Sequence, residues 1–148
     1  MKSEEALSQE NFSCEQEKAF VNIVYTANTF YLQEVKRLKP HGISPEQYNV
    51  LRILRGSHPR KMNLLDISRR MLDRNSNATR LVEKLRMKGL VDRKPSDKDR
   101  RQVEICITNE GLNLLKLLDR DSLIWGNKNR ELAETEAEIL NKLLEKMR

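Results

Sequence analysis

Residues 75–84 combine short hydrogen-bonding side chains with cations, and residues 98–101 place three cations around one carboxylate. Asparagine and arginine can each form two hydrogen bonds with the edge of a single base, and serine and threonine can bond a base or a phosphate. Lysine and arginine neutralise phosphates and release their counterions. Together these side chains could bind a nucleic acid. The candidate residues are Asn75, Ser76, Asn77, Thr79, Arg80, Lys84, Lys98, Asp99, Arg100 and Arg101.

Positive charge is concentrated in the same part of the chain. Residues 60–101 hold 14 Lys or Arg against 6 Asp or Glu, a net charge of +8, whereas the whole chain carries +6. The remainder is therefore slightly acidic, at −2. A basic surface confined to one segment is expected where a protein neutralises phosphates. A solvated basic surface without a ligand is the alternative.

Two helices joined by a polar turn are expected to position the first group of candidates. Apolar residues at helical spacing predict one helix over about 63–72 and another through 78–85, and Gly89 ends the second. Between them lies the break Asp73-Arg-Asn-Ser. The apolar stripe of the second helix leaves its opposite face free for a ligand. The residues expected to be buried are Leu64, Leu65, Ile67, Met71, Ala78, Leu81, Val82 and Leu85.

Two short strands with a charged turn are predicted after the second helix. Residues 102–107 alternate apolar with other side chains, so we expect them to pair with residues 90–94. The turn between them is too polar for a core, but arginine at such a tip suits a narrow, electronegative minor groove. We expect Asp99 to bond the guanidinium of Arg101 and to hold it extended.

Apolar helices are predicted on both sides of this region. The spacing of apolar residues indicates a helix over about 14–38, Ser44 is expected to cap the next helix, and Thr108 the helix after the strands. The terminal helices are too apolar to remain exposed, so we infer a second subunit packed through the two termini. The alternative is that the end helices fold back on their own domain.

These elements predict a mainly α fold with a small antiparallel β-hairpin wing, which is a winged helix-turn-helix with N- and C-terminal dimerisation helices. The length of 148 residues fits one domain. Residues 1–13 are expected to be a flexible N-terminus and residues 14–148 the single domain. Within it, 14–42 and 109–148 would be dimerisation helices, and 43–108 the DNA-binding lobe.

Enzyme, metal and membrane classes are disfavoured. The sequence has no glycine-rich phosphate loop, no serine or cysteine paired with a plausible histidine, and no metal-ligand spacing. We therefore expect no catalytic residue, no cofactor and no metal. Two cysteines, no signal peptide and no long apolar stretch predict a reducing, cytoplasmic location and no membrane partner.

Several segments, in this order, resemble the MarR family of bacterial winged-helix transcription regulators over about residues 15–148. The resemblance implies a homodimer whose terminal helices form the dimer base, with recognition helices in successive major grooves of a near-palindrome and wing arginines in the flanking minor grooves. By motif position, Arg101 resembles the family's minor-groove arginine and Asp99 its positioning carboxylate. The segments are Ile43-Ser-Pro-Glu-Gln-Tyr, Thr79-Arg-Leu-Val-Glu-Lys-Leu, Lys88-Gly-Leu-Val-Asp-Arg, Asp97-Lys-Asp-Arg-Arg and Ile107-Thr-Asn-Glu-Gly.

The chain departs from the family pattern just before the recognition helix. The family commonly has a small residue and Leu-Ser there, whereas this chain has Leu72-Asp-Arg-Asn. We therefore expect Asp73 to replace serine as the helix cap.

Members of the family are usually switched by small ligands or oxidants. The reactive cysteine of the hydroperoxide-sensing branch corresponds to a place near Phe20, not to Cys14. The start of a helix favours a thiolate at Cys14, but Glu15 and Glu17 oppose it, and Cys106 is expected to be passive. Tyrosine at helical spacing is more often part of a core than of a ligand site. The candidates for an aromatic or phenolic ligand are nevertheless Tyr25, Tyr31, Tyr48 and Arg52.

The sequence thus predicts a transcriptional regulator that binds double-stranded DNA sequence-specifically. It would act as a homodimeric, ligand-responsive repressor on a near-palindromic operator. Two alternatives stay open. One is a redox-sensing regulator that uses Cys14, and the other is an architectural or protein-interaction module without a specific operator.

Overall fold

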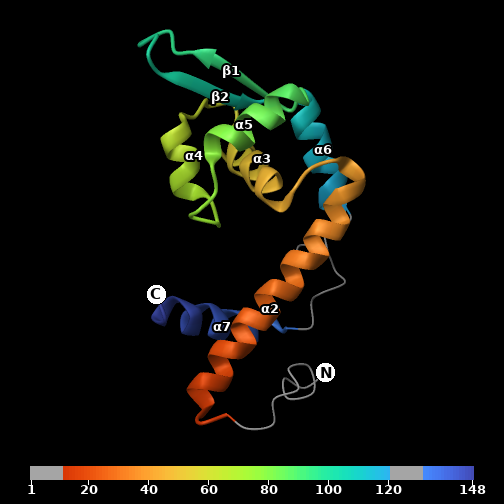
Figure 1. The fold of residues 1–148 in the computed structure, drawn as a ribbon, viewed down its shortest axis with the longest axis vertical. Helices are drawn as coiled ribbons and strands as arrows, with labels where there is room; N and C mark the ends of the chain where they lie inside the picture. The colour runs from red at the N-terminus through yellow and green to blue at the C-terminus, as the bar shows by residue number, and fades with distance from the viewer. Residues whose placement is uncertain (1–11, 121–131) are drawn as a thin grey trace. The chain divides into compact units, whose positions relative to one another are not determined.

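The computed structural model describes residues 12–120 and 132–148 (Figure 1). It is mainly helical with one two-stranded antiparallel sheet, which confirms the predicted fold class. The chain forms two compact units, one ending at Gly42 and the other beginning at Ile43. None of the described helices is both long and apolar enough to span a membrane. The elements are α2 (Glu15–Leu38), η1 (Lys39–His41), α3 (Pro45–Ser57), α4 (Leu64–Arg70), α5 (Ala78–Met87), β1 (Val91–Pro95), β2 (Val103–Ile107), α6 (Asn109–Arg120) and α7 (Glu134–Lys146).

The first unit contains α2, whose bounds match the predicted helix to within a residue. Glu34 and Arg37 form an ion pair of 2.6 Å one turn apart on this helix. The chain leaves α2 through the short η1 and Gly42, which adopts the left-handed conformation (φ 69°) that glycine allows. Much of the apolar surface of α2 is exposed, and the predicted role of this helix in a dimer stays a prediction. The exposed residues are Phe20, Val24, Tyr25, Phe30, Tyr31, Leu32 and Val35.

The core of the second unit is built around α3, which contacts α4, α5, α6 and β2. The predicted cap at Ser44 is confirmed, because the Gln47 N–H donates to Ser44 Oγ at 3.2 Å and the Ser44 N–H donates to Gln47 Oε1 at 3.0 Å. Arg55 on α3 also pairs with Asp119 on α6 at 2.6 Å. The fully buried core side chains are Leu51, Leu54, Val50, Ile67, Val82, Leu85, Val91, Ile105, Leu115 and Leu118.

Helix α4 is shorter than the predicted helix over 63–72. Asn63 caps it by accepting the Asp66 N–H at 2.8 Å, and it ends at Arg70. The prediction that Leu65 is buried is wrong, since this side chain is 58% exposed. Leu65 lies two residues from the buried Ile67, which puts the two side chains about 200° apart around the helix. A helix of two turns buries only one such stripe.

The predicted hairpin is confirmed in its pairing. Strands β1 and β2 are antiparallel, with Val91 opposite Ile107 and Pro95 opposite Val103. Met62 adds a short bridge that the sequence analysis did not foresee, because its N–H and C=O bond the backbone of Ile105 at 2.9 and 2.8 Å. The loop before α4 is therefore attached to β2.

Thr108 joins the hairpin to α6 and confirms the predicted cap. Its Oγ1 accepts the Gly111 N–H at 3.1 Å and donates to the Gly89 carbonyl at 2.7 Å. Gly89, with φ 72°, ends the preceding helix as predicted. One hydroxyl thus links the end of α5 to the start of α6.

The C-terminal region is described only from residue 132 onward. Helix α7 exposes Ile139, Leu140 and Leu143, as expected of an apolar helix that needs a partner. Most of the predicted flexible segment 1–13, and the part of the predicted dimerisation region at 121–131, lie outside the described residues.

Candidate nucleic-acid interface

The start of α5 differs from the prediction. Its cap is Asn77, whose Oδ1 accepts the Arg80 N–H at 3.1 Å. Asp73 instead accepts the Asn75 N–H at 2.9 Å, within the turn that precedes the helix. Aspartate readily bonds the backbone two residues on, and here that local turn is favoured over an earlier helix start. The predicted capping role of Asp73 is therefore wrong.

Helix α5 has one buried and one exposed face. Ala78, Val82 and Leu85 are buried as predicted, whereas Leu81 is only half-buried. Thr79, Arg80 and Lys84 are exposed on the remaining surface, and none of the ion pairs found within 12–120 and 132–148 involves Arg80 or Lys84. Two cations of this face are therefore available to an anionic partner.

The predicted contact residues before α5 differ in their exposure. Asn75 and Asn77 are exposed. The Oγ atom of Ser76, by contrast, is buried, and no hydrogen-bond partner for it lies among the described residues. Of the three, only the two asparagines present polar groups at the surface.

Glu83 connects α5 to the hairpin. Its carboxylate pairs with Arg86 on the same helix at 2.7 Å and with Arg93 on β1 at 3.8 Å. The hydrogen bond from Arg86 is the main reason that the pKa of Glu83 lies below its ordinary value. This carboxylate pairs with two cations beside the candidate interface.

The wing tip is held by its backbone. The Ser96 N–H donates to the Gln102 carbonyl at 2.8 Å, and the Gln102 N–H donates to the Asp99 carbonyl at 2.9 Å. Asp99 Oδ1 accepts the Arg101 backbone N–H at 3.0 Å, so the predicted bond from the Arg101 guanidinium to Asp99 is wrong. Lys98, Arg100 and Arg101 are exposed at the tip, and Figure 1 shows the hairpin projecting beyond the neighbouring helices.

A cluster at the base of the wing was missed by the sequence analysis. Glu104 on β2 accepts a hydrogen bond from Ser96 Oγ at 3.0 Å and pairs with Lys61 Nζ at 3.2 Å. Lys61 precedes α4 and is distant in sequence, so no spacing rule could pair it with Glu104. The hydrogen bonds from Lys61 and then from Ser96 lower the pKa of Glu104, and the same pair raises the pKa of Lys61.

The lowered pKa of Glu104 predicts a pH dependence. Because its folded-state pKa lies below its ordinary value of 4.5, the ionised carboxylate stabilises the fold above that pH, and this contribution is lost as the pH falls through the folded-state pKa. Wild type should therefore exceed Glu104→Gln in unfolding free energy at neutral pH, and the difference should shrink at an acidic pH below the folded-state pKa. Urea denaturation at both pH values measures this, and a difference that persists in acid would contradict it.

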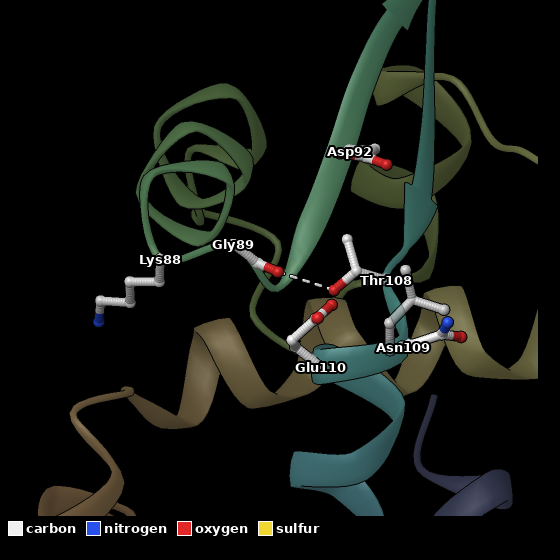
Figure 2. Close-up of a pocket in the computed structure, with 7 residues that line it drawn as sticks. Lys88, Gly89, Asp92, Thr108, Asn109 and Glu110 are labelled. Carbon is white, nitrogen blue, oxygen red and sulfur yellow. Dashed lines mark hydrogen bonds between the residues drawn. The ribbon is translucent and has the colours of Figure 1, made fainter.

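A pocket lies where α5, β1 and α6 meet, and Figure 2 shows the Thr108–Gly89 hydrogen bond at its centre. Lys88 points away from this bond in the same view. The lining mixes one cation with two carboxylates, so its charge favours no single class of ligand. None of the four predicted ligand residues lines it. The lining residues are Lys88, Gly89, Asp92, Ile107, Thr108, Asn109 and Glu110.

The four predicted ligand residues fall in two units. Tyr25 and Tyr31 are exposed on α2, in the first unit. Tyr48 on α3 is only 5% exposed, and the Cζ atom of Arg52 lies 5.8 Å from the centre of its ring. Tyr48 therefore belongs to the core of the second unit, where a cation covers its ring.

Within the described residues, neither the cysteines nor the acidic side chains form a reactive or metal-binding site. Cys14 is exposed at the N-terminus of α2, where its side chain makes no capping hydrogen bond, and Cys106 is half-buried on β2. No cluster of three or more His, Cys, Asp or Glu able to hold a metal occurs in residues 12–120 or 132–148.

Comparisons with known proteins agree on one family. The MarR family model matches residues 43–103. The HTH-type transcriptional regulator MhqR of Bacillus subtilis (strain 168) is 30% identical over 115 residues, which cover 76% of this chain and 77% of MhqR. The crystal structure of a MarR transcription factor from Planctomyces limnophilus is 32% identical, with a TM-score of 0.65 over 93% of this chain and 98% of that one.

A more distant structure shows the same fold. This is a MarR mutant from E. coli complexed with operator DNA, which has 20% identity and a TM-score of 0.73 and covers 93% of this chain and 99% of that one. The fold therefore persists where the sequences have diverged. From the relatives at 30% identity or more, and from the winged helix itself, the chain belongs to the MarR family of transcriptional regulators.

Proposed function

We propose that this regulator represses transcription by binding, as a homodimer, to a near-palindromic site in duplex DNA. The observation that carries the proposal is the position of four cations that take part in none of the ion pairs described above. Arg80 and Lys84 lie on the solvent face of α5, and Arg100 and Arg101 at the tip of the wing. A basic helix beside a basic hairpin matches a major groove next to a minor groove.

Helix α5 is suited to the major groove by its two faces. Its buried stripe attaches it to α3 and α4, so that the exposed face can approach base edges without loss of the core. Asn75, Asn77 and Thr79 stand near the N-terminal end, from which recognition helices contact bases. Arg80 and Lys84 follow at positions from which they can reach a base or a phosphate. The Asn77 Oδ1 already accepts the Arg80 N–H, so the amide nitrogen of Asn77 is left to donate to a base.

The wing is suited to the minor groove. Its tip carries Lys98, Arg100 and Arg101 on a hairpin that is closed by backbone hydrogen bonds. Arginine is favoured in a narrow minor groove, where the negative potential is strongest. Two wings on a dimer would therefore flank the two major-groove contacts.

A homodimer is supported by the exposed apolar residues of α2 and α7. Large apolar side chains exposed along a helix are typical of an interface, and a two-fold dimer would match a palindromic site. Homodimers and ligand-responsive repression are typical of this family. We include both in the proposal, with a small aromatic or phenolic compound as the class of effector that the tyrosines of α2 could contact.

The test is a binding titration on selected DNA. Genomic fragments retained by the purified protein are sequenced, and the shared site is compared by fluorescence anisotropy with a scrambled duplex of equal composition at physiological salt. We expect the selected site to bind at least ~1000-fold more tightly, with affinity falling steeply as salt rises. Equal affinity for both duplexes would favour an architectural module instead. Sedimentation at micromolar concentration should show a dimer, and a monomer would count against the palindromic mode.

A further inference from the structure

Three side chains form a continuous line of contacts beneath the wing, and we call them the wing relay. Lys61 Nζ lies 3.2 Å from Glu104 Oε2, and Ser96 Oγ donates to Glu104 Oε1 at 3.0 Å. Ser96 Oγ in turn accepts the Lys98 N–H at 3.3 Å. The wing relay therefore connects the loop before α4 to the backbone of the wing tip.

Both ends of the wing relay are fixed. Lys61 precedes Met62, whose backbone is bonded twice to Ile105, the neighbour of Glu104. Ser96 is only 6% exposed, although the residues on either side of it are exposed. A buried hydroxyl that both donates and accepts has a defined orientation. The wing relay thus links the wing tip to the part of the fold where Met62 pairs with Ile105.

A negative charge at Glu104 is unexpected in a surface that binds DNA. A carboxylate at the base of a DNA-contacting hairpin repels phosphates, so on charge alone its removal should strengthen DNA binding. The bonds of Glu104 to Lys61 and Ser96 should instead strengthen DNA binding. A hairpin held in one conformation loses less conformational freedom when it binds DNA. The two effects predict opposite signs for the same substitution.

We propose that Glu104 is a positioning residue of the DNA interface, which acts through Ser96 and Lys61 to hold the wing tip in the conformation that enters the minor groove. This inference rests on the proposed DNA binding. It assigns a role to three residues that do not themselves need to contact DNA. It also means that the Glu104 carboxylate favours DNA binding, although both are negatively charged.

The first test measures DNA affinity. Glu104→Val keeps a residue that suits a strand and removes both side-chain contacts. Asp97→Asn is the matched control, because it removes the same charge from the same hairpin but lies outside the wing relay. We expect Glu104→Val to bind the selected site about tenfold more weakly, and Asp97→Asn to bind as tightly as wild type or more tightly. Glu104→Gln, which can still accept the Ser96 hydroxyl, should fall between wild type and Glu104→Val. Tighter or unchanged binding by Glu104→Val would overturn the inference.

The second test needs no DNA. Trypsin can cut after Lys98, Arg100 and Arg101, so the rate of cleavage at the tip reports its order. Glu104→Val should be cut there several times faster than wild type, and Asp97→Asn at the wild-type rate. Unchanged cleavage at the tip, or an equal rise in cleavage at the tip and elsewhere in the second unit, would overturn the positioning role. If wild type itself lacked a preferred duplex, the proposed function would fail, and the cleavage rates would still decide whether Glu104 orders the wing.

Discussion

Arg101→Ala is expected to weaken binding to the selected DNA site by about 100-fold, which corresponds to about 1.4 kcal/mol for each of the two copies in a dimer. The reason is that Arg101 is exposed at the wing tip, while Asp99 holds its backbone N–H and leaves its guanidinium outside that bond. Fluorescence anisotropy on the selected site measures the change. The unfolding free energy should stay within about 0.5 kcal/mol of wild type, because the side chain is not part of the core.

Arg100→Ala is the matched control for this prediction. It removes the same charge from the adjacent position, which is also exposed. If Arg101 enters the minor groove, Arg100→Ala should lose only the part of the DNA affinity that comes from nonspecific electrostatic attraction. This loss should appear as a weaker dependence of affinity on salt, for any duplex. Equal losses for the two variants would show that the tip acts by charge alone. A loss of helical circular dichroism in Arg101→Ala would assign the residue a structural role instead.

Gly111→Ala is expected to destabilise the second unit by about 3 kcal/mol, at the upper end of the usual cost of overpacking. A Cβ atom at this position would lie 2.4 Å from the Leu90 carbonyl oxygen and 2.7 Å from Cγ1 of Ile107. The first of these contacts is with backbone, which cannot rotate away. The first turn of α6 would have to move from the hairpin, and the Thr108 bonds to Gly89 and Gly111 would be strained. Urea denaturation of wild type and variant measures the loss.

Gly56→Ala provides the comparison for Gly111→Ala. Gly56 lies in α3, and an added Cβ atom there would meet nothing within 4 Å. Because alanine is the better helix former, this variant should be more stable than wild type by roughly 0.5 to 1 kcal/mol. Similar losses for the two variants would mean that the close approach at Gly111 is not the cause.

Elements whose limits are set by neighbouring residues could be predicted from the sequence. Ser44 and Gln47 cap each other three residues apart, and Thr108 caps α6 in the same local way. The hairpin pairing followed from period-two alternation in residues 102–107 together with a polar turn. In each case the interacting groups are close in sequence, so the spacing itself carries the information.

Competition between local alternatives was harder to predict. Asp73 and Asn77 are both good capping residues, and the sequence alone favoured the wrong one. In the structure, α5 begins at Ala78, which packs against the core, so Asn77 caps the helix and Asp73 closes the turn. Leu65 is similar, since its apolar side chain suggested burial but α4 has only one face on the core.

By itself the sequence determined the winged helix-turn-helix, its family and the segments that carry the cations, because periodicity, caps and charge clustering are local properties of a chain. The tertiary structure alone decided which of these cations are paired, that Asp99 bonds backbone and not guanidinium, and that Lys61 reaches Glu104. The pair of Lys61 and Glu104 joins side chains that are distant in sequence and meet only after the loop before α4 has joined β2. No spacing rule records such a contact, because its geometry is set by the packing of the whole lobe.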